Sequence, residues 1–203
     1  MDELTLIKVG DRIPSLEMDA YFPDRDELGK INLSGIIQEG KWLVLFFYPA
    51  DYTFVCPTEL ADVGKIYPQL KELGVEVVSV STDTHFVHYA WKRTEKLLAD
   101  ISFPMAADPT HKVSRIFGVL DENTGLALRG TFVIDPDGTL VASEINYYPV
   151  GRNAEELLRK VRAFQHVRNN PQQVCPARWE PGKKTLTPGK EIVGKVGEKL
   201  EGS

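Results

Sequence analysis

The residues best suited to chemistry in this chain are its two cysteines, Cys56 and Cys175. They lie too far apart in the sequence to form a local metal clip, and neither belongs to a Cys-x-x-Cys pair. An apolar run ends at Pro49, a short loop follows, and Cys56 then opens a predicted helix. An arbitrary cysteine is more often a small buried hydrophobe. Here the strand, loop and helix order favours a redox nucleophile, and Cys175 is the only other thiol that can resolve it.

A helix start is a favourable place for a reactive thiol. Only a small fraction of a free cysteine is thiolate at neutral pH. The unpaired N–H groups and partial positive charge of a helix N-terminus favour the anion. Pro57 suits the first helical turn because its missing N–H is not needed there. A helix terminus supplies only part of the stabilisation, so we expect a cation close to Cys56, which these residues alone do not identify.

The elements that must position this thiol can be predicted from hydrophobic periodicity. WLVLFFYP is a nearly unbroken apolar run, typical of a strand buried on both faces. The pattern predicts, in order, a strand at 42–49, a helix from Pro57 to Gly74 that Pro68 should kink or split, a strand at 75–83, a helix at 85–98, a strand at 103–108, a helix at 111–118, a hairpin at 130–145 and a helix from Asn153 to about His166. This alternation indicates an α/β class with a thioredoxin-like sheet and N-terminal additions.

The amino-acid composition changes after Asn169. The remaining residues are rich in Pro, Gly and Lys, and their apolar positions are sparse. We therefore predict a thioredoxin-like domain at 1–168 and a C-terminal arm at 169–203, ordered only where it docks. Cys175 lies on this arm.

Composition narrows the classes of function. The chain has 203 residues, 42% hydrophobic content and a formal net charge of −5, which favours neither nucleic-acid binding nor an anionic membrane surface. No apolar run approaches the roughly 18 residues of a membrane span, and the first residues do not resemble a secretory signal. Two cysteines do not make a disulfide scaffold. We expect a cytoplasmic protein.

Two separated motifs resemble the peroxiredoxin family. PADYTFVCPTE, around Cys56, resembles the peroxidatic loop, and VCPARW, around Cys175, resembles the resolving segment of the typical two-cysteine branch. STDTHFVHYAW, RGTFVID and YYPVGR add further matches, so that the likeness spans roughly residues 8–190. The tail TLTPGKEIVGK is similar to the branch of alkyl hydroperoxide reductase peroxidase subunits.

The resemblance implies a role for each matching residue. Cys56 matches the cysteine that attacks peroxide and becomes a sulfenic acid. Arg129 matches the arginine that stabilises the thiolate, and would supply the missing cation. Thr53 matches the hydroxyl that bonds the peroxide, and Pro49 the ring that shields the pocket from water. Cys175 matches the resolving cysteine, which comes from the other subunit of an antiparallel dimer.

Three further residues match supporting positions. Glu59 and Arg152 match residues that hold the arginine and the loop in place, and Trp91 matches a position near the disulfide-forming region. Because Cys56 opens a helix, its first turn must unwind before the two sulfurs meet, so loop 50–58 is expected to be a low-stability switching element.

The implied activity is reduction of hydrogen peroxide and small organic hydroperoxides, for antioxidant defence, without a metal or cofactor. The resemblance also implies homodimers that assemble into a ring of five dimers, and a thioredoxin-like or flavoprotein reductase as the partner. The alternative is a redox-switched chaperone or peroxide sensor with the same fold. A general disulfide oxidoreductase is disfavoured by the absence of Cys-x-x-Cys.

Other polar residues have simpler interpretations. His85 and His88 have the spacing of a metal pair, but no Cys-x-x-Cys accompanies them, so we expect them to flank a surface or an interface. Asp135 and Asp137 fit turn formation better than an acid/base pair. The segment after Trp91 lacks the GGLG insertion of peroxide-sensitive members, and no Tyr or Phe follows Trp179. This departure predicts an enzyme that resists over-oxidation.

Overall fold

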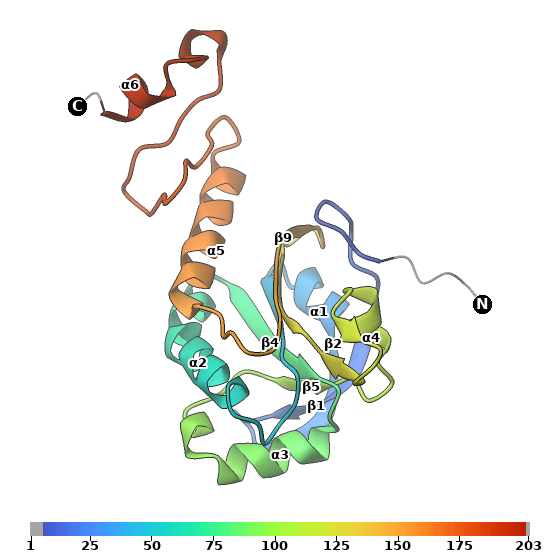
Figure 1. Ribbon diagram of the computed structural model, residues 1–203. Coiled ribbons are helices and arrows are strands. Elements are labelled where there is room, and N and C mark those ends of the chain that lie inside the picture. The colour runs from blue at the N-terminus through green and yellow to red at the C-terminus, as the bar shows by residue number, and fades with distance from the viewer. Residues whose placement is uncertain (1–5, 202–203) are drawn as a thin grey trace. The chain divides into compact units, whose positions relative to one another are not determined.

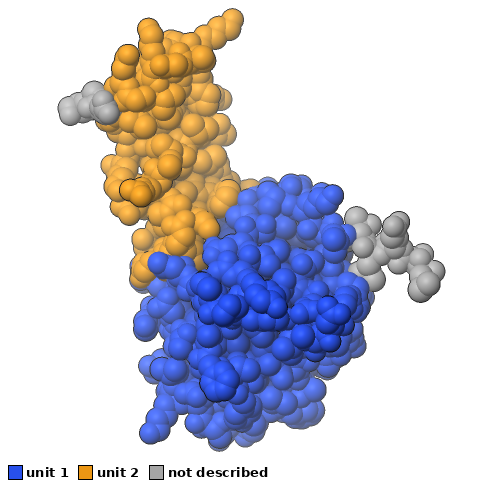
Figure 2. Space-filling view, in the orientation of Figure 1, with its two compact units in different colours: residues 1–154 blue, residues 155–203 orange. Residues whose placement is uncertain are grey.

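The structure of the protein is a computed structural model that describes residues 6–201 (Figure 1). It divides into two compact units, one up to Ala154 and one from Glu155, which are coloured separately in Figure 2. The predicted domain boundary at 168–169 falls inside the second unit and stays a prediction. In the described part of the chain, no helix is both long and apolar enough to cross a membrane.

The strands and helices alternate along most of the chain. In chain order they are β1 (Glu17–Phe22), β2 (Glu27–Asn32), α1 (Leu33–Gln38), β3 (Trp42–Phe47), α2 (Cys56–Glu72), β4 (Val75–Ser81), α3 (His85–Thr94), the 3₁₀ helix η1 (Lys96–Leu98), β5 (Met105–Ala107), α4 (Lys112–Ile116), β6 (Leu120–Asp121), β7 (Leu126–Ala127), β8 (Arg129–Ile134), β9 (Leu140–Asn146), α5 (Ala154–Asn169), the 3₁₀ helix η2 (Lys190–Ile192) and α6 (Val196–Glu201).

The first unit is built on a seven-stranded mixed sheet with the order β2-β1-β5-β4-β3-β8-β9. Strands β3, β4 and β5 are parallel, β8 pairs antiparallel with β3, and β9 pairs antiparallel with β8. The N-terminal hairpin β1–β2 is added beyond β5. Figure 1 shows helices packed on this sheet. The predicted α/β class with N-terminal additions is confirmed.

Strand β3 is buried along its whole length, as the apolar run predicts. Leu43, Leu45 and Phe47 belong to the hydrophobic core that also includes side chains of α1 and α4. Because side chains alternate along a strand, Phe46 lies on the opposite face, and Tyr48 continues this row. The rings of Tyr48 and of Trp91 on α3 are 6.0 Å apart on this second face.

Most of the predicted elements are present with shifted ends. Helix α2 runs through Pro68 as one element, so the proline does not split it. The predicted helix at 85–98 is shorter, because Glu95 adopts an extended conformation after α3 and its carboxylate caps η1 by accepting the Leu97 N–H. In the predicted hairpin turn, Asp135 accepts backbone N–H groups, including that of Asp137, and therefore acts as a turn former.

The second unit consists of most of α5 and the C-terminal arm. Two short helical segments, η2 and α6, lie in the arm, and an isolated bridge pairs Val174 with Leu186. Arg159 of α5 donates to the carbonyl of Trp179, whose indole N–H donates to the Lys183 carbonyl. These contacts hold the part of the arm that carries Cys175 against α5.

Candidate active site

Cys56 is the first residue of α2, and its side chain is 0% exposed. The preceding residue, Val55, provides no side-chain cap, but its carbonyl accepts the N–H groups of Thr58 and Glu59 at 3.0 and 3.2 Å. Pro57 occupies the first turn, as predicted. The sulfur therefore lies at the positive end of a 17-residue helix, away from solvent.

The cation expected near the sulfur is Arg129. Its Nη1 lies 3.5 Å from Cys56 Sγ, and its side chain is 4% exposed. Antiparallel pairing of β8 with β3, in a register that matches Thr131 with Phe46, brings the start of β8 to the C-terminal end of β3. The loop to Cys56 leaves from that same end, so residues far apart in the sequence meet here.

The backbone next to Arg129 requires a glycine. A Cβ on Gly130 would lie 2.7 Å from side-chain carbons of both Phe132 and Val119, closer than packed carbons approach. The Arg129 guanidinium is then held by two acceptors: Nε donates to the Tyr148 carbonyl at 2.7 Å, and Nη1 donates to Glu59 at 2.6 Å.

Glu59 connects Arg129 to a second arginine, Arg152. The Arg152 backbone N–H and Nε donate to Glu59 Oε1 at 2.9 and 2.8 Å, and its Nη2 reaches Oε2 at 3.2 Å. Arg152 also donates to Thr131 and lies with its guanidinium carbon 3.5 Å from the centre of the Phe46 ring. Burial lowers the pKa of Arg152, and the bonds to Glu59 oppose this shift.

The positive and negative charges of these three side chains do not balance. Arg129, Arg152 and Glu59 are each at most 4% exposed, and two cations share one carboxylate. The negative charge of the half-buried Glu144 opposes the lowering of the Arg152 pKa, but by less than burial lowers it. An excess positive charge buried beside a sulfur favours an anion on that sulfur.

The loop between β3 and α2 carries the other residues singled out by sequence. Pro49 is buried and Thr53 is half-buried, with the Thr53 hydroxyl donating to the Ala50 carbonyl at 2.8 Å. Tyr52 between them has a φ of 54° and lies with its ring 6.2 Å from that of Trp91. Trp91 is thus brought to this loop, at its Tyr52 side.

Cys175 is a half-buried free thiol in the second unit, and Cys56 is also free. The Cys175 Sγ lies 3.8 Å from the Ala163 carbonyl of α5, beside a largely apolar cavity of about 390 Å³ between α5 and the arm. Burial raises the pKa of the Cys175 thiol, and the positive charge of Arg159 partly offsets this.

Sequence reasoning missed several site residues. Tyr148 holds Arg129 through its backbone carbonyl, and a carbonyl contact leaves no signature in residue type. The expectation that His88 flanks a surface or an interface is wrong: its side chain is 0% exposed, and Asp51 and the Ala106 carbonyl partner its two nitrogens. Among residues 6–201, no group of three or more His, Cys, Asp or Glu side chains could hold a metal ion.

Comparisons with known proteins agree with this geometry. Residues 9–143 match the model of the AhpC/TSA family, and residues 163–196 match the C-terminal domain of 1-Cys peroxiredoxin. The chain is 58% identical to alkyl hydroperoxide reductase C of Amphibacillus xylanus, over 78% of this chain and 84% of that protein. It is 51% identical to the protein of the same name from Staphylococcus aureus, over 87% and 93%.

Solved structures give the same result. Enterococcus faecalis AhpC superimposes with a TM-score of 0.78 at 45% identity, covering 83% of this chain and 98% of that chain. The reduced 2-Cys peroxiredoxin of Plasmodium vivax superimposes with a TM-score of 0.87 at 32% identity, covering 93% and 98%. The predicted thioredoxin-like peroxiredoxin fold is therefore confirmed. The chain belongs to the AhpC/TSA family and is a peroxiredoxin enzyme.

Proposed function

We propose that this peroxiredoxin reduces hydrogen peroxide and small organic hydroperoxides with Cys56 as the nucleophile and Cys175 as the resolving thiol. The observation that carries the proposal is the buried Cys56 sulfur at a helix N-terminus with the Arg129 guanidinium 3.5 Å away. This arrangement stabilises negative charge on the sulfur and on an oxygen that bonds to it.

In the first step, the Cys56 thiolate attacks one peroxide oxygen and the O–O bond breaks. The leaving oxygen takes a proton and departs as water or an alcohol, and the sulfur becomes a sulfenic acid. Arg129 stabilises the charge that moves onto the leaving oxygen, while Glu59 and Arg152 hold the arginine. We assign peroxide binding to the Thr53 hydroxyl and exclusion of water to the Pro49 ring, in the loop that precedes Cys56.

In the second step, the thiol of Cys175 from another subunit attacks the sulfenic sulfur, releasing water and forming a disulfide. Because the Cys56 side chain is 0% exposed, the first turn of α2 must open for this attack. The bonds that must break include those from the Thr58 and Glu59 N–H groups to the Val55 carbonyl. Trp91 lies at the Tyr52 side of this loop and is expected to respond to its opening.

A dithiol must then reduce the disulfide, and we propose a thioredoxin-like protein or a flavoprotein reductase. Such a partner operates in a compartment that keeps thiols reduced, so we place the protein in the cytoplasm, in antioxidant defence. Rates of peroxide consumption with each purified reductase system test this assignment. A steady-state turnover below about 1 s⁻¹ with both systems would favour the alternative of a peroxide sensor or redox-switched chaperone.

A homodimer that assembles further into a ring of five dimers fits the exposed apolar residues. Strand β9 is an edge of the sheet, and Ile145 near its end and Tyr147 just beyond it are 46% and 68% exposed. Phe54, in the loop before α2, and Phe86, on α3, are further exposed apolar residues, at 92% and 61%. Light scattering on the reduced and oxidised protein measures the size of the assembly in each state.

Two cysteine variants test the chemistry directly. Cys56→Ser is expected to abolish peroxide consumption, and Cys175→Ser is expected to consume one equivalent and to continue only with a small thiol such as dithiothreitol. On a non-reducing gel, one equivalent of peroxide should convert the parent protein into a disulfide-linked dimer, and neither variant should form it. Full activity of Cys56→Ser would refute the assignment of the nucleophile.

A further inference from the structure

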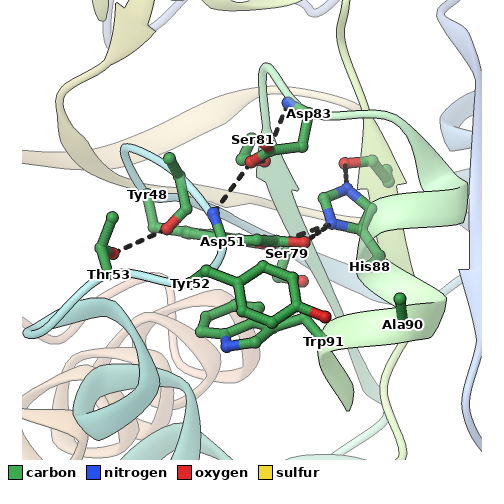
Figure 3. A network of polar contacts seen from close by, with 12 residues as sticks. Tyr48, Asp51, Tyr52, Thr53, Ser79, Ser81, Asp83, His88, Ala90 and Trp91 are labelled. Atoms are coloured by element: carbon green, nitrogen blue, oxygen red, sulfur yellow. Dashed lines mark hydrogen bonds and ion pairs between the residues drawn. The ribbon is translucent and has the colours of Figure 1, made fainter. Parts of the chain in front are cut away.

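A buried acid and a buried histidine lie next to the active-site loop and have no part in the proposed chemistry. Asp51, in the loop after β3, is 6% exposed, and His88, on α3, is 0% exposed. Asp51 Oδ2 and His88 Nδ1 are 2.7 Å apart (Figure 3). The Tyr48 hydroxyl donates to the other carboxylate oxygen, also at 2.7 Å.

The hydrogen bonds fix how many protons this pair holds. His88 Nε2 lies 3.1 Å from the Ala106 carbonyl, which can only accept, so Nε2 carries a hydrogen. The short contact between Nδ1 and Asp51 needs one more proton, on the imidazole or on the carboxyl group. With one proton between them the pair is neutral overall, which allows both groups to be buried. Burial raises the pKa of Asp51, and its bond to His88 opposes that shift.

Asp51 is also held through its backbone. Its N–H donates to Asp83 Oδ2 at 2.9 Å, and the same oxygen accepts the Ser81 hydroxyl at 2.7 Å. Asp83 follows β4, which is parallel to β3, so both loops leave the same edge of the sheet. Asp51 is therefore anchored to β4 by its N–H and, through His88, to α3 and to β5, where Ala106 lies.

The anchored residue stands in the middle of the turn that carries Pro49 and Thr53. Thr53 is tied back to Ala50, and the left-handed conformation of Tyr52 reverses the chain between them. The cluster that holds the sulfur side of the site, Arg129 with Glu59 and Arg152, shares no residue with the Asp51–His88 network. The arginine cluster therefore acts on the Cys56 sulfur, and the Asp51–His88 network acts on the loop that carries Pro49 and Thr53.

We propose that His88 is a positioning residue for the peroxide-binding loop: through its proton-sharing contact with Asp51, it holds the Pro49–Thr53 turn in the conformation that receives the peroxide. The inference rests on the proposed function and deepens it. It separates two properties of the enzyme. His88 does not affect the reactivity of the Cys56 sulfur, whereas the placement of the peroxide depends on His88.

Two substitutions of equal polarity test this role. In His88→Asn the amide nitrogen takes the place of Nδ1 and keeps the bond to Asp51, whereas in His88→Gln it takes the place of Nε2 and keeps only the bond to Ala106. We expect the second-order rate constant for hydrogen peroxide to fall about 10- to 100-fold in His88→Gln. In His88→Asn we expect a fall of no more than about threefold.

The control measurement is alkylation of Cys56 by iodoacetamide, made with each variant in the Cys175→Ser background. Iodoacetamide reports the nucleophilicity of the sulfur without needing a bound peroxide, so its rate is expected to be unchanged or faster. Equal losses of peroxide rate in the two variants, no loss in either, or alkylation that slows in step with the peroxide reaction would each overturn the proposal.

A second pair guards against variants that fail to fold. In Asp51→Asn the amide accepts from Tyr48 and donates to neutral His88, so the network stays closed and the peroxide rate should remain within about threefold of the parent. Asp51→Leu, which fills the same space without polar atoms, should lose about tenfold or more. Similar rates for these two variants would also refute the role. A parent protein without peroxidase activity would instead refute the proposed function itself.

Discussion

Replacing Arg129 with glutamine removes the cation that lies 3.5 Å from the Cys56 sulfur and keeps a polar side chain of similar shape. Glu59 would still be paired with Arg152, so the remaining buried pair would be neutral and the excess positive charge beside the sulfur would be gone. The thiolate would then be stabilised mainly by the N-terminus of α2.

The size of the effect follows from the burial of this contact. Two unit charges about 4 Å apart interact by about 4 kcal/mol at an effective dielectric constant of about 20. At about 1.4 kcal/mol for each factor of ten, this corresponds to roughly a thousandfold in rate. Removing one donor from an oxyanion site in other enzymes costs about 10²- to 10³-fold. We therefore expect the rate constant for hydrogen peroxide to fall about 10²- to 10³-fold in Arg129→Gln.

Stopped-flow measurement of sulfenic acid formation in the Cys175→Ser background gives this rate constant without the resolving step. Arg129→Lys is the matched control, because it keeps the charge but loses the forked contact with Glu59 and Tyr148. Its rate constant should lie between those of the parent protein and of Arg129→Gln. Alkylation of Cys56 should slow together with the peroxide reaction in Arg129→Gln. A loss below about fivefold in a folded variant would refute the electrostatic role of Arg129.

Three further predictions concern other parts of the molecule. Gly130→Ala should lower the free energy of unfolding by about 1–3 kcal/mol, measured by urea denaturation, because the new Cβ meets two core side chains at 2.7 Å; an unchanged midpoint would contradict this. Burial raises the pKa of Cys175, so in Cys56→Ser the rate of Cys175 alkylation should keep rising with pH above about 8.5. Adding Arg159→Gln should move the midpoint of this pH profile higher still. A midpoint below that of a free thiol would exclude burial as the cause. After cycling with millimolar peroxide, mass spectrometry should find little sulfinic acid on Cys56, since the segment after Trp91 contains no glycine insertion; extensive sulfinic acid at low doses would count against quick unwinding.

The central sheet and its helices could be predicted because their signals are local. The apolar run that becomes β3 and the periodic stripe that becomes α2 carry their own evidence. The hairpin β1–β2 lacks such a signal, since β2 is exposed at five of its six positions and reads as a polar segment. The order of the strands beyond β5 depends on pairing that no local pattern encodes.

The active site also has a part that local pattern predicts and a part that it does not. The helix start at Cys56 could be predicted, but the identity of its cation could not be found from local pattern, because Arg129 reaches the sulfur only through the β3–β8 register. Family resemblance supplied that residue. The burial of His88 could not be predicted from its spacing to His85, which is that of a metal pair, because only the fold brings Asp51 and Ala106 to its nitrogens.

The unequal charge of the buried cluster ties the oxidation state of the sulfur to the folding of one helical turn. By thermodynamic reciprocity, if the folded turn stabilises the Cys56 thiolate, the thiolate stabilises the folded turn by the same free energy. Oxidation to a neutral sulfenic acid removes this counter-ion and leaves Arg129 and Arg152 with only Glu59 between them. In the proposed mechanism, the reaction with peroxide therefore removes the electrostatic support of the turn that must open next, so that no separate signal is needed to release Cys56.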